Sequence, residues 1–466
     1  MLGGNARKNR LKSPGQPMGG KGRGSTVEEP VKRDLGKSRT NQLRRKRRKN
    51  GEERERNTKG KGKNMNTGPN YKKGNRLEII KILYAGVVLP YRSLPMLAGE
   101  TALTYRMARK MRNEGVLETV YGYAGKYIVL KDGKRNYHDF LCQYLAPEYL
   151  DACQSQMQEY VRCKEVKEDN SADKMRKKPR MERMLNMSEI LLMMHLGGVV
   201  VYPEERQPLA TLLKRGREKG ISYYFNSVEI KKLEILPYQE EIREGESRVQ
   251  TSRIYGMLVC DSGTYAVYDI GKKLIEWRQY YEVRMKTHIK KLTAGVVEPG
   301  TEVGCILIAS DIKMFARVIT NEYDKKFKGS KILLNIDYAY EDMYGLPATK
   351  EGVAILQLMQ QKDWIEKMEN CLLAGCSRRN TNYSVICDAV SETDGYILLF
   401  CNSNIARLKI FLRRAINARQ DERFCIYCFD FQLPLLAAME IGDTRIKSMS
   451  IYDYIKMLET AYPQGE

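Results

Sequence analysis

Most of the net positive charge lies in the first 75 residues, and this divides the sequence in two. Residues 1–75 contain 23 Lys and Arg and 6 Asp and Glu, whereas the whole 466-residue chain contains 80 and 57. The segment has few aliphatic side chains, so it buries too little apolar surface to offset the entropy of ordering its backbone. We predict a disordered basic tail over residues 1–75. An alternative interpretation is that translation begins at Met65, directly before the patterned region.

The densest cationic run of the tail is RRKRRK, residues 44–49. It predicts contacts with nucleic-acid phosphates through Arg44, Arg45, Arg47 and Arg48. The alternative interpretation is a solvated tail that keeps the protein soluble. Neither interpretation provides recognition of a nucleotide sequence, because phosphate contacts carry no base information.

From Arg76 onward, apolar spacing predicts secondary structure. Residues 76–89 have helical spacing, Pro90 marks a turn, and residues 91–97 predict a short helix. Residues 100–113 predict a third helix that ends at Gly115, a left-handed cap position. Residues 116–121 and 126–130 predict two strands around a Gly-Tyr-Ala-Gly turn. Three helices and a hairpin are typical of a winged helix-turn-helix domain, which we place at residues 76–135.

The third helix of a winged helix lies in the DNA major groove, so its polar residues are the candidate contacts. Leu103, Met107 and Met111 have the spacing of its buried stripe. The hairpin adds an aromatic and a cationic side chain. An alternative is that this module mediates protein contacts. The candidate DNA-binding residues are Thr101, Thr104, Tyr105, Arg106, Arg109, Lys110, Arg112, Tyr123 and Lys126.

After the predicted winged helix, residues 136–183 suggest a helical connector and a charged linker. Over residues 184–460, apolar runs alternate with helical patterns, which predicts an α/β domain with a mixed sheet. Within it, residues 395–431 predict a right-handed βαβ unit. The predicted strands are residues 256–260, 265–270, 305–309, 332–336, 397–401 and 424–429.

The sequence has no motif for a membrane span, a secretory signal, a disulfide framework, a histidine-based metal site or a phosphate-binding loop. No apolar run suits a membrane span or a secretory signal, so we expect a cytoplasmic protein without membrane partners. The 11 cysteines are scattered along the sequence, which indicates reduced thiols and not a disulfide framework. Cys425 and Cys428 are three positions apart in an apolar strand, where the alternation of side chains points their sulfurs in opposite directions. The three histidines are far apart, and no phosphate-binding loop occurs.

Residues 257–271 read as a hairpin that leads into a helix, a layout with which one class of nucleases displays its site. Together with the preceding pattern, residues 76–300 resemble the replication-relaxation family of plasmids and integrative mobile elements. The resemblance implies a winged-helix domain fused to a restriction-endonuclease-like domain. It further implies an Asp that opens one strand and a Glu-x-Lys pair on the next.

This chain lacks most of the residues of the nuclease site that the resemblance implies. Tyr255 occupies the position of the metal-binding Asp, and Val267-Tyr268-Asp269 occupies the Glu-x-Lys position. Glu229-Ile230-Lys231 spells Glu-x-Lys but precedes the hairpin. We therefore expect a degenerate, inactive nuclease-like fold with no catalytic residues, metal or cofactor. Were the domain active, Asp269, Glu229 and Lys231 would be the candidates, with Mg²⁺ as the metal.

The leading hypothesis is sequence-directed binding of double-stranded DNA in the replication, transfer or regulation of a plasmid or integrative element. Other replication or conjugation proteins are possible partners. A metal-dependent DNA nuclease is one alternative. The other is a transcriptional regulator whose C-terminal domain senses a ligand or dimerises.

Overall fold

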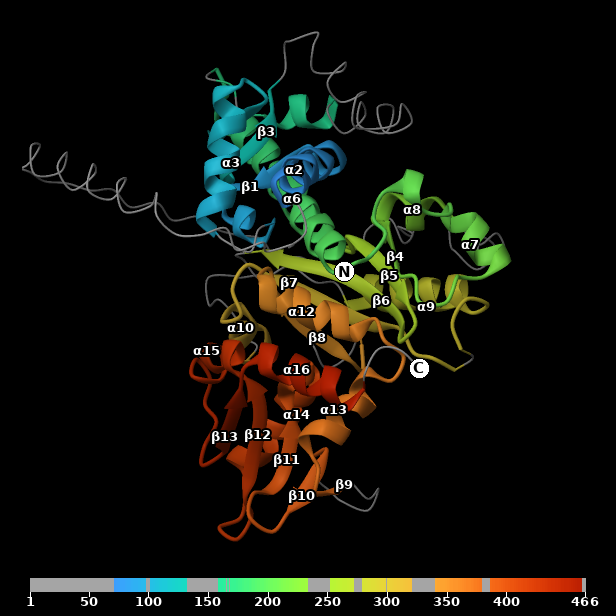
Figure 1. Ribbon diagram of the computed structural model, residues 1–466, viewed down its shortest axis with the longest axis vertical. Coiled ribbons are helices and arrows are strands. Elements are labelled where there is room, and N and C mark those ends of the chain that lie inside the picture. The colour runs from blue at the N-terminus through green and yellow to red at the C-terminus, as the bar shows by residue number, and fades with distance from the viewer. Residues whose placement is uncertain are drawn as a thin grey trace, which may run out of the picture. The chain divides into compact units, whose positions relative to one another are not determined.

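The computed structural model describes residues 71–97, 101–131, 158–233 except 165 and 167, 252–320 except 272–278 and 299, and 340–462 except 379–385 (Figure 1). Over these ranges the protein mixes helices and strands, and the strands form three sheets. Residues 1–70 of the predicted basic tail and the predicted strand 332–336 lie outside the described residues, and the prediction of disorder for residues 71–75 is wrong, because they form the first turn of a helix that continues to Gly86.

The N-terminal part forms a small antiparallel sheet with three helices. The strand order is β1-β3-β2. The predicted helices, the hairpin and the left-handed Gly115, with a φ of 76°, are confirmed. The predicted turn at Pro90 is wrong, because a short strand pairs there with β3. The elements are α2 (Tyr71–Gly86), β1 (Val88–Pro90), η1 (Tyr91–Leu97), α3 (Thr101–Asn113), β2 (Leu117–Gly122) and β3 (Gly125–Leu130).

A long helix, α6 (Ser171–Leu196), packs against this part. We expected a charged linker up to residue 183, but the helix begins at Ser171, where the Asn170 side chain accepts a hydrogen bond from the Asp173 backbone. The charged side chains of its first half are mostly exposed, whereas Met181 joins a buried cluster with Val88 and Val129. Burial of one apolar stripe therefore makes this polar segment helical.

Helices α2 and α6 approach each other closely at Gly86. A Cβ atom on this residue would lie 2.4 Å from Ser188 Oγ, and the Ser188 hydroxyl donates a hydrogen bond of 2.9 Å to the Gly86 carbonyl. The N-terminal part is thus fastened to the helix that continues into the larger part of the protein.

The second sheet has the order β4-β5-β6-β7-β8. Its first three strands are antiparallel, and β7 and β8 continue parallel to β6. The strands are β4 (Tyr223–Asn226), β5 (Gly256–Cys260), β6 (Gly263–Gly271), β7 (Gly304–Ala309) and β8 (Met343–Pro347). The helices that accompany them are η2 (Pro203–Glu205), α7 (Leu209–Arg215), α8 (Ser227–Lys232), α9 (Gln279–Thr293) and α10 (Met314–Thr320).

The third sheet has the order β13-β12-β11-β10-β9. Strands β11 and β12 are parallel and joined through α14, which confirms the predicted βαβ connection. Instead of one mixed sheet, the region thus contains two, because strand partners are set by contacts that local apolar runs do not encode. The strands are β9 (Ser377–Arg378), β10 (Ala389–Ser391), β11 (Gly395–Leu399), β12 (Phe424–Phe429) and β13 (Arg445–Met449). The helices are α12 (Lys350–Met359), α13 (Trp364–Leu372), η5 (Phe400–Asn402), α14 (Ile405–Ile416), η6 (Asp430–Gln432), α15 (Leu433–Leu436) and α16 (Ile451–Ala461).

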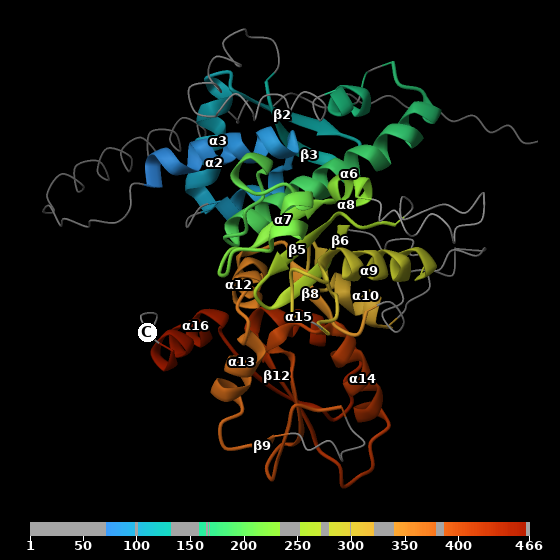
Figure 2. The ribbon, with the colours of Figure 1, turned by 90° about the vertical axis from the view of Figure 1, so that its right-hand side faces the viewer.

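Two hydrophobic clusters cover opposite faces of these two sheets. Helices α12, α13 and α16 belong to one cluster, and α9, α10 and α14 belong to the other. Figure 2 shows the two groups of helices on opposite sides of the strands. Cys425 and Cys428 are buried in different clusters, as the alternation of strand side chains predicted. Among the described helices, none has the length and apolar character needed to cross a membrane.

Candidate nucleic-acid interface

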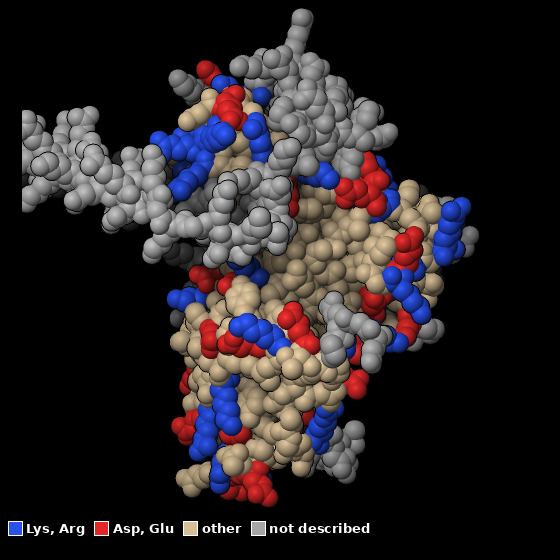
Figure 3. All heavy atoms as spheres, in the orientation of Figure 1, with Lys and Arg blue, Asp and Glu red and all other residues tan. Residues whose placement is uncertain are grey.

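The exposed side of α3 is cationic. Arg106, Arg109, Lys110 and Arg112 are all exposed, and the first three are spaced i, i+3, i+4, which places them on one helix face. Lys110 lies 4.0 Å from Glu114. Within the described ranges, Arg106, Arg109 and Arg112 have no carboxylate within ion-pair distance. Figure 3 shows Lys and Arg side chains gathered over this helix.

The buried side of α3 corrects one candidate. Thr104 is fully buried, so it cannot contact DNA, and its hydroxyl finds no hydrogen-bond partner in the described part of the chain. Thr104, Ala108 and Met111 form the buried stripe, with Met107 only partly buried beside it. Met111 of the predicted stripe is buried and Met107 partly so, and Thr104 faces the same side of the helix as Met111. Thr101 is the first residue of α3.

Tyr105 belongs to a cluster that also includes the hairpin. Its ring stacks on Tyr91 of η1 with the ring centroids 5.2 Å apart and the planes at 25°. The Lys126 ammonium lies 3.7 Å from the Tyr91 ring centroid and 5.3 Å from that of Tyr121. Tyr121, which is 75% exposed, extends the aromatic surface to the outside of the hairpin. Tyr91 was missed from the sequence because it lies in the short segment before α3.

Tyr123 anchors the hairpin. Its hydroxyl donates a hydrogen bond of 2.9 Å to Asp169, which also pairs with Lys177 of α6. The hydrogen bond from Lys177, followed by that from the Val166 backbone, lowers the pKa of Asp169 to about 2. Tyr123 is thus half-buried and used within the fold, so it is a weaker candidate for DNA contact than Tyr121.

A buried carboxylate joins this region to α6. Glu189 is 1% exposed and accepts two hydrogen bonds from Arg92, of 3.2 and 2.7 Å. The buried Ser93 hydroxyl donates a third, of 2.6 Å. Because these bonds compensate its burial, Glu189 fixes the position of η1, the element that precedes α3.

Glu229, one of the conditional nuclease residues, is occupied by the fold. Both of its oxygens lie 2.7 Å from the Arg206 guanidinium. It also accepts a hydrogen bond of 2.9 Å from the Asn226 backbone, which completes the capping box at the start of α8. These contacts give Glu229 a structural role, because they hold the start of α8.

Lys231 has an altered pKa. Burial, and next the nearby charge of Arg183, lower the pKa of Lys231 to about 8. A lowered lysine pKa is a feature of many catalytic sites, although structural networks produce it as well. Here the ammonium donates a hydrogen bond of 3.0 Å to the Ser252 carbonyl.

Asp269 is buried on β6, in the neighbourhood of Tyr255. Burial, followed by the Asp269 charge, raises the pKa of Tyr255 to about 12. Arg183 lies over the Tyr255 ring at 4.6 Å, and the Asn186 amide donates a hydrogen bond of 3.2 Å to its hydroxyl. Among the described residues, no group of three or more acidic, His or Cys side chains is arranged to hold a metal ion.

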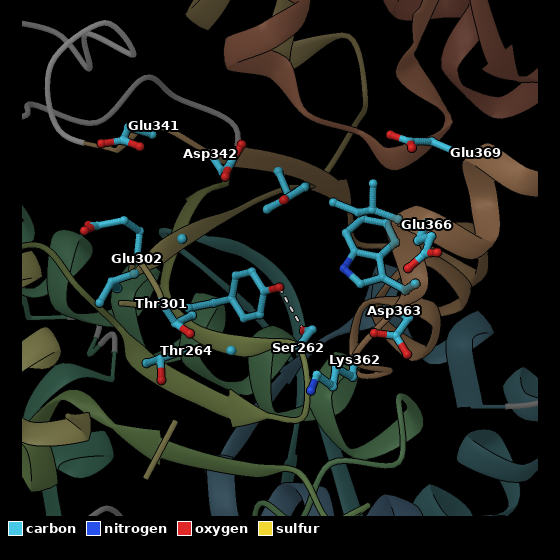
Figure 4. Close-up of a pocket in the computed structure, with 17 residues that line it drawn as sticks. Ser262, Thr264, Thr301, Glu302, Glu341, Asp342, Lys362, Asp363, Glu366 and Glu369 are labelled. Carbon is cyan, nitrogen blue, oxygen red and sulfur yellow. Dashed lines mark hydrogen bonds between the residues drawn. The ribbon is translucent and has the colours of Figure 1, made fainter. Parts of the chain in front are cut away.

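A second charged region is a cavity of about 470 Å³ beside β7 and β8, here called the acidic cavity. Figure 4 shows Glu302, Glu341 and Asp342 on one side and Asp363, Glu366 and Glu369 on the other. Such a surface repels phosphates. The cationic face of α3 is therefore the better candidate for a nucleic-acid interface.

The tail candidates Arg44, Arg45, Arg47 and Arg48 lie outside the described residues. Comparisons with protein-family models, with curated proteins and with solved structures find no match.

Proposed function

We propose that this protein binds double-stranded DNA, with α3 in the major groove and the β2–β3 hairpin beside it. The order of α2, β1, η1, α3, β2 and β3 and their antiparallel sheet are those expected for a winged helix. The observation that carries the proposal is the set of exposed arginines on α3, Arg106, Arg109 and Arg112, which lack carboxylate partners among the described residues. Unpaired cations on the exposed side of a helix are suited to phosphates and to base edges.

The second sheet is proposed to be a nuclease-like domain that supports binding without cutting. Strands β5 and β6 lead into α9, in agreement with the layout that the resemblance implies. Tyr255 stands where that layout has a metal-binding carboxylate, and Glu229 is paired with Arg206. A role in the replication, transfer or regulation of a plasmid or integrative element is proposed from the resemblance alone.

The experiment is a titration of labelled duplex DNA with the full chain, followed by fluorescence anisotropy at several salt concentrations. If about six cations neutralise phosphates, affinity falls roughly a thousandfold between about 50 and 200 mM salt. Log affinity falls with log salt, and replacing both Arg106 and Arg109 by Ala should make this fall less steep, reducing the magnitude of the slope by about two.

The matched control replaces Lys214 and Arg215 by Ala. These two residues are exposed on α7, and their replacement changes the net charge by the same amount. We expect this control to keep the parental slope. A salt-independent affinity, or equal losses in the two double variants, would contradict the proposal.

A further inference from the structure

A second cavity, of about 460 Å³, lies beside α3 where the hairpin, η1 and α6 meet, and is here called the α3 cavity. Its lining includes Tyr91, Tyr105, Lys126 and Asn186. Sites for small organic ligands span roughly 300 to 1,000 Å³, so the α3 cavity has room for one nucleotide.

The aromatic wall of the α3 cavity is suited to a nucleobase. Tyr91 and Tyr105 stack on each other, which holds both rings in place, and both remain partly exposed. Stacking of a base on a tyrosine ring works for every base, because each has an aromatic face. The face of Tyr91 that does not meet Tyr105 is covered by the exposed Lys126 side chain, so an unpaired base can stack there once this flexible side chain moves aside.

One cation of the lining is free to meet a phosphate. Lys126 is exposed and contacts the Tyr91 and Tyr121 rings, but no carboxylate of the described ranges pairs with it. Arg92, the other cation of the lining, is engaged by Glu189. The lining also contains the Glu182 carboxylate, which has an interaction of its own within the fold, so Lys126 is the one cation of the lining left to meet a phosphate.

The lining also contains an uncharged polar side chain, Asn186. Asn186 donates its amide hydrogen to Tyr255, which orients its carbonyl oxygen as an acceptor. Tyr255 has a pKa of about 12, raised first by burial, so it stays neutral at physiological pH. An amide oxygen accepts from the exocyclic amino groups of adenine, cytosine or guanine, which thymine lacks.

We propose that the α3 cavity holds one unpaired nucleotide of a DNA strand that leaves the duplex bound by α3. Tyr105 covers one face of the Tyr91 ring and the Lys126 ammonium the other, so the base takes the place of the ammonium on that face, and the displaced Lys126 pairs with the phosphate of the nucleotide. This inference rests on the proposed duplex binding and names a more specific substrate: a junction between duplex and single strand. The lining also includes Ile270 of β6, the residue after Asp269.

The test compares the affinity of the full chain for a blunt duplex and for the same duplex with a single-stranded extension. The first unpaired nucleotide of the extension is 2-aminopurine, whose fluorescence falls when it stacks. We expect the junction to bind about tenfold more tightly, which corresponds to one stacked base, and the fluorescence to be quenched.

Tyr91→Leu should remove the preference and the quenching while blunt-duplex binding remains. Tyr452→Leu, on the exposed face of α16, is the matched control and should keep both. Because Tyr91 also packs within the fold, Lys126→Gln is the second variant, at an exposed position. It should lower the preference for the junction severalfold, whereas Lys456→Gln on α16 should not.

The outcomes separate the two proposals. Salt-sensitive duplex binding with equal affinity for junction and blunt DNA overturns the α3 cavity assignment alone. The α3 cavity assignment is also overturned if Tyr91→Leu and Tyr452→Leu both lose the preference for the junction, or if both keep it. It is overturned as well if Lys126→Gln keeps the full preference for the junction. Absence of salt-sensitive duplex binding overturns the proposed function and, with it, this inference.

Discussion

The cationic face of α3 and the acidic cavity are both strongly charged, but they differ in how their charges are paired. In the acidic cavity, Glu302 pairs with Lys286 and Lys290, and Glu369 lies 3.9 Å from Arg378, whereas Glu341, Asp363 and Glu366 have no ion pair among the described residues. The arginines of α3 have no carboxylate partners within the described ranges. Charges satisfied inside the fold serve stability, whereas unpaired charges of one sign are available to an external partner. The number of unpaired charges is therefore more informative than net charge.

The largest effect is expected where a charge is fully internal. Glu189→Ala removes the partner of Arg92 and of the buried Ser93 hydroxyl, and should destabilise the protein by about 2 kcal/mol, part of the loss being offset because Arg92 can hydrate. Glu205→Ala breaks a more exposed pair with Lys81 and should cost about 0.5 kcal/mol. Chemical denaturation measures both. If Glu189→Ala and Glu205→Ala lost equal amounts of stability, the distinction between internal and surface ion pairs would not hold.

The charges on the surface are tested by substitutions that reverse their sign. Arg109→Glu places a negative charge on the cationic face and should weaken duplex binding by about tenfold or more. Glu366→Arg, at an exposed position of the acidic cavity, should change affinity less than about threefold. Anisotropy titrations at constant salt compare the two. If Glu366→Arg strengthened binding as much as Arg109→Glu weakened it, net charge alone would explain binding.

Lys231 gives a smaller, pH-dependent effect. Its pKa is lowered from 10.5 in the unfolded chain to about 8 in the fold, chiefly by burial, so its charged form destabilises the native state. Below pH 8 this cost is fully present, and it is relieved as pH rises toward 10. The stability difference between Lys231→Gln and the parent should therefore shrink by about 1 kcal/mol between pH 8 and 10, allowing for solvent screening. A constant difference in denaturation free energy would contradict this.

The smallest effect is expected from magnesium. In the proposed nuclease-like layout Tyr255 stands at the position of the metal-binding carboxylate, so added Mg²⁺ should leave bound duplex DNA intact on a denaturing gel. Chelation should therefore make no difference to the DNA. Mg²⁺-dependent cutting that Asp269→Ala abolishes and Asp443→Ala, at an exposed position, retains would establish the nuclease alternative.

Local patterns predicted much of the N-terminal part. The helix that ends at Gly115 and the hairpin of β2 and β3 follow from apolar spacing and from glycines where turns need them. The cationic side of α3 also follows from the spacing of Arg106, Arg109 and Lys110. These features depend on residues a few positions apart, so the sequence is sufficient to identify them.

Tertiary contacts decided the rest. Strand β1 exists because Val88 pairs with Val129, and Arg92 is fixed by Glu189, which lies 97 residues away. The inward turn of Thr104 depends on which side of α3 meets the core. The α3 cavity combines side chains from η1, α3, β3 and α6. The sequence by itself thus determined which segments become helices and strands and where cations gather, because these depend on neighbouring residues. The structure decided which side chains are buried, paired or left free, because those contacts join residues far apart in the chain.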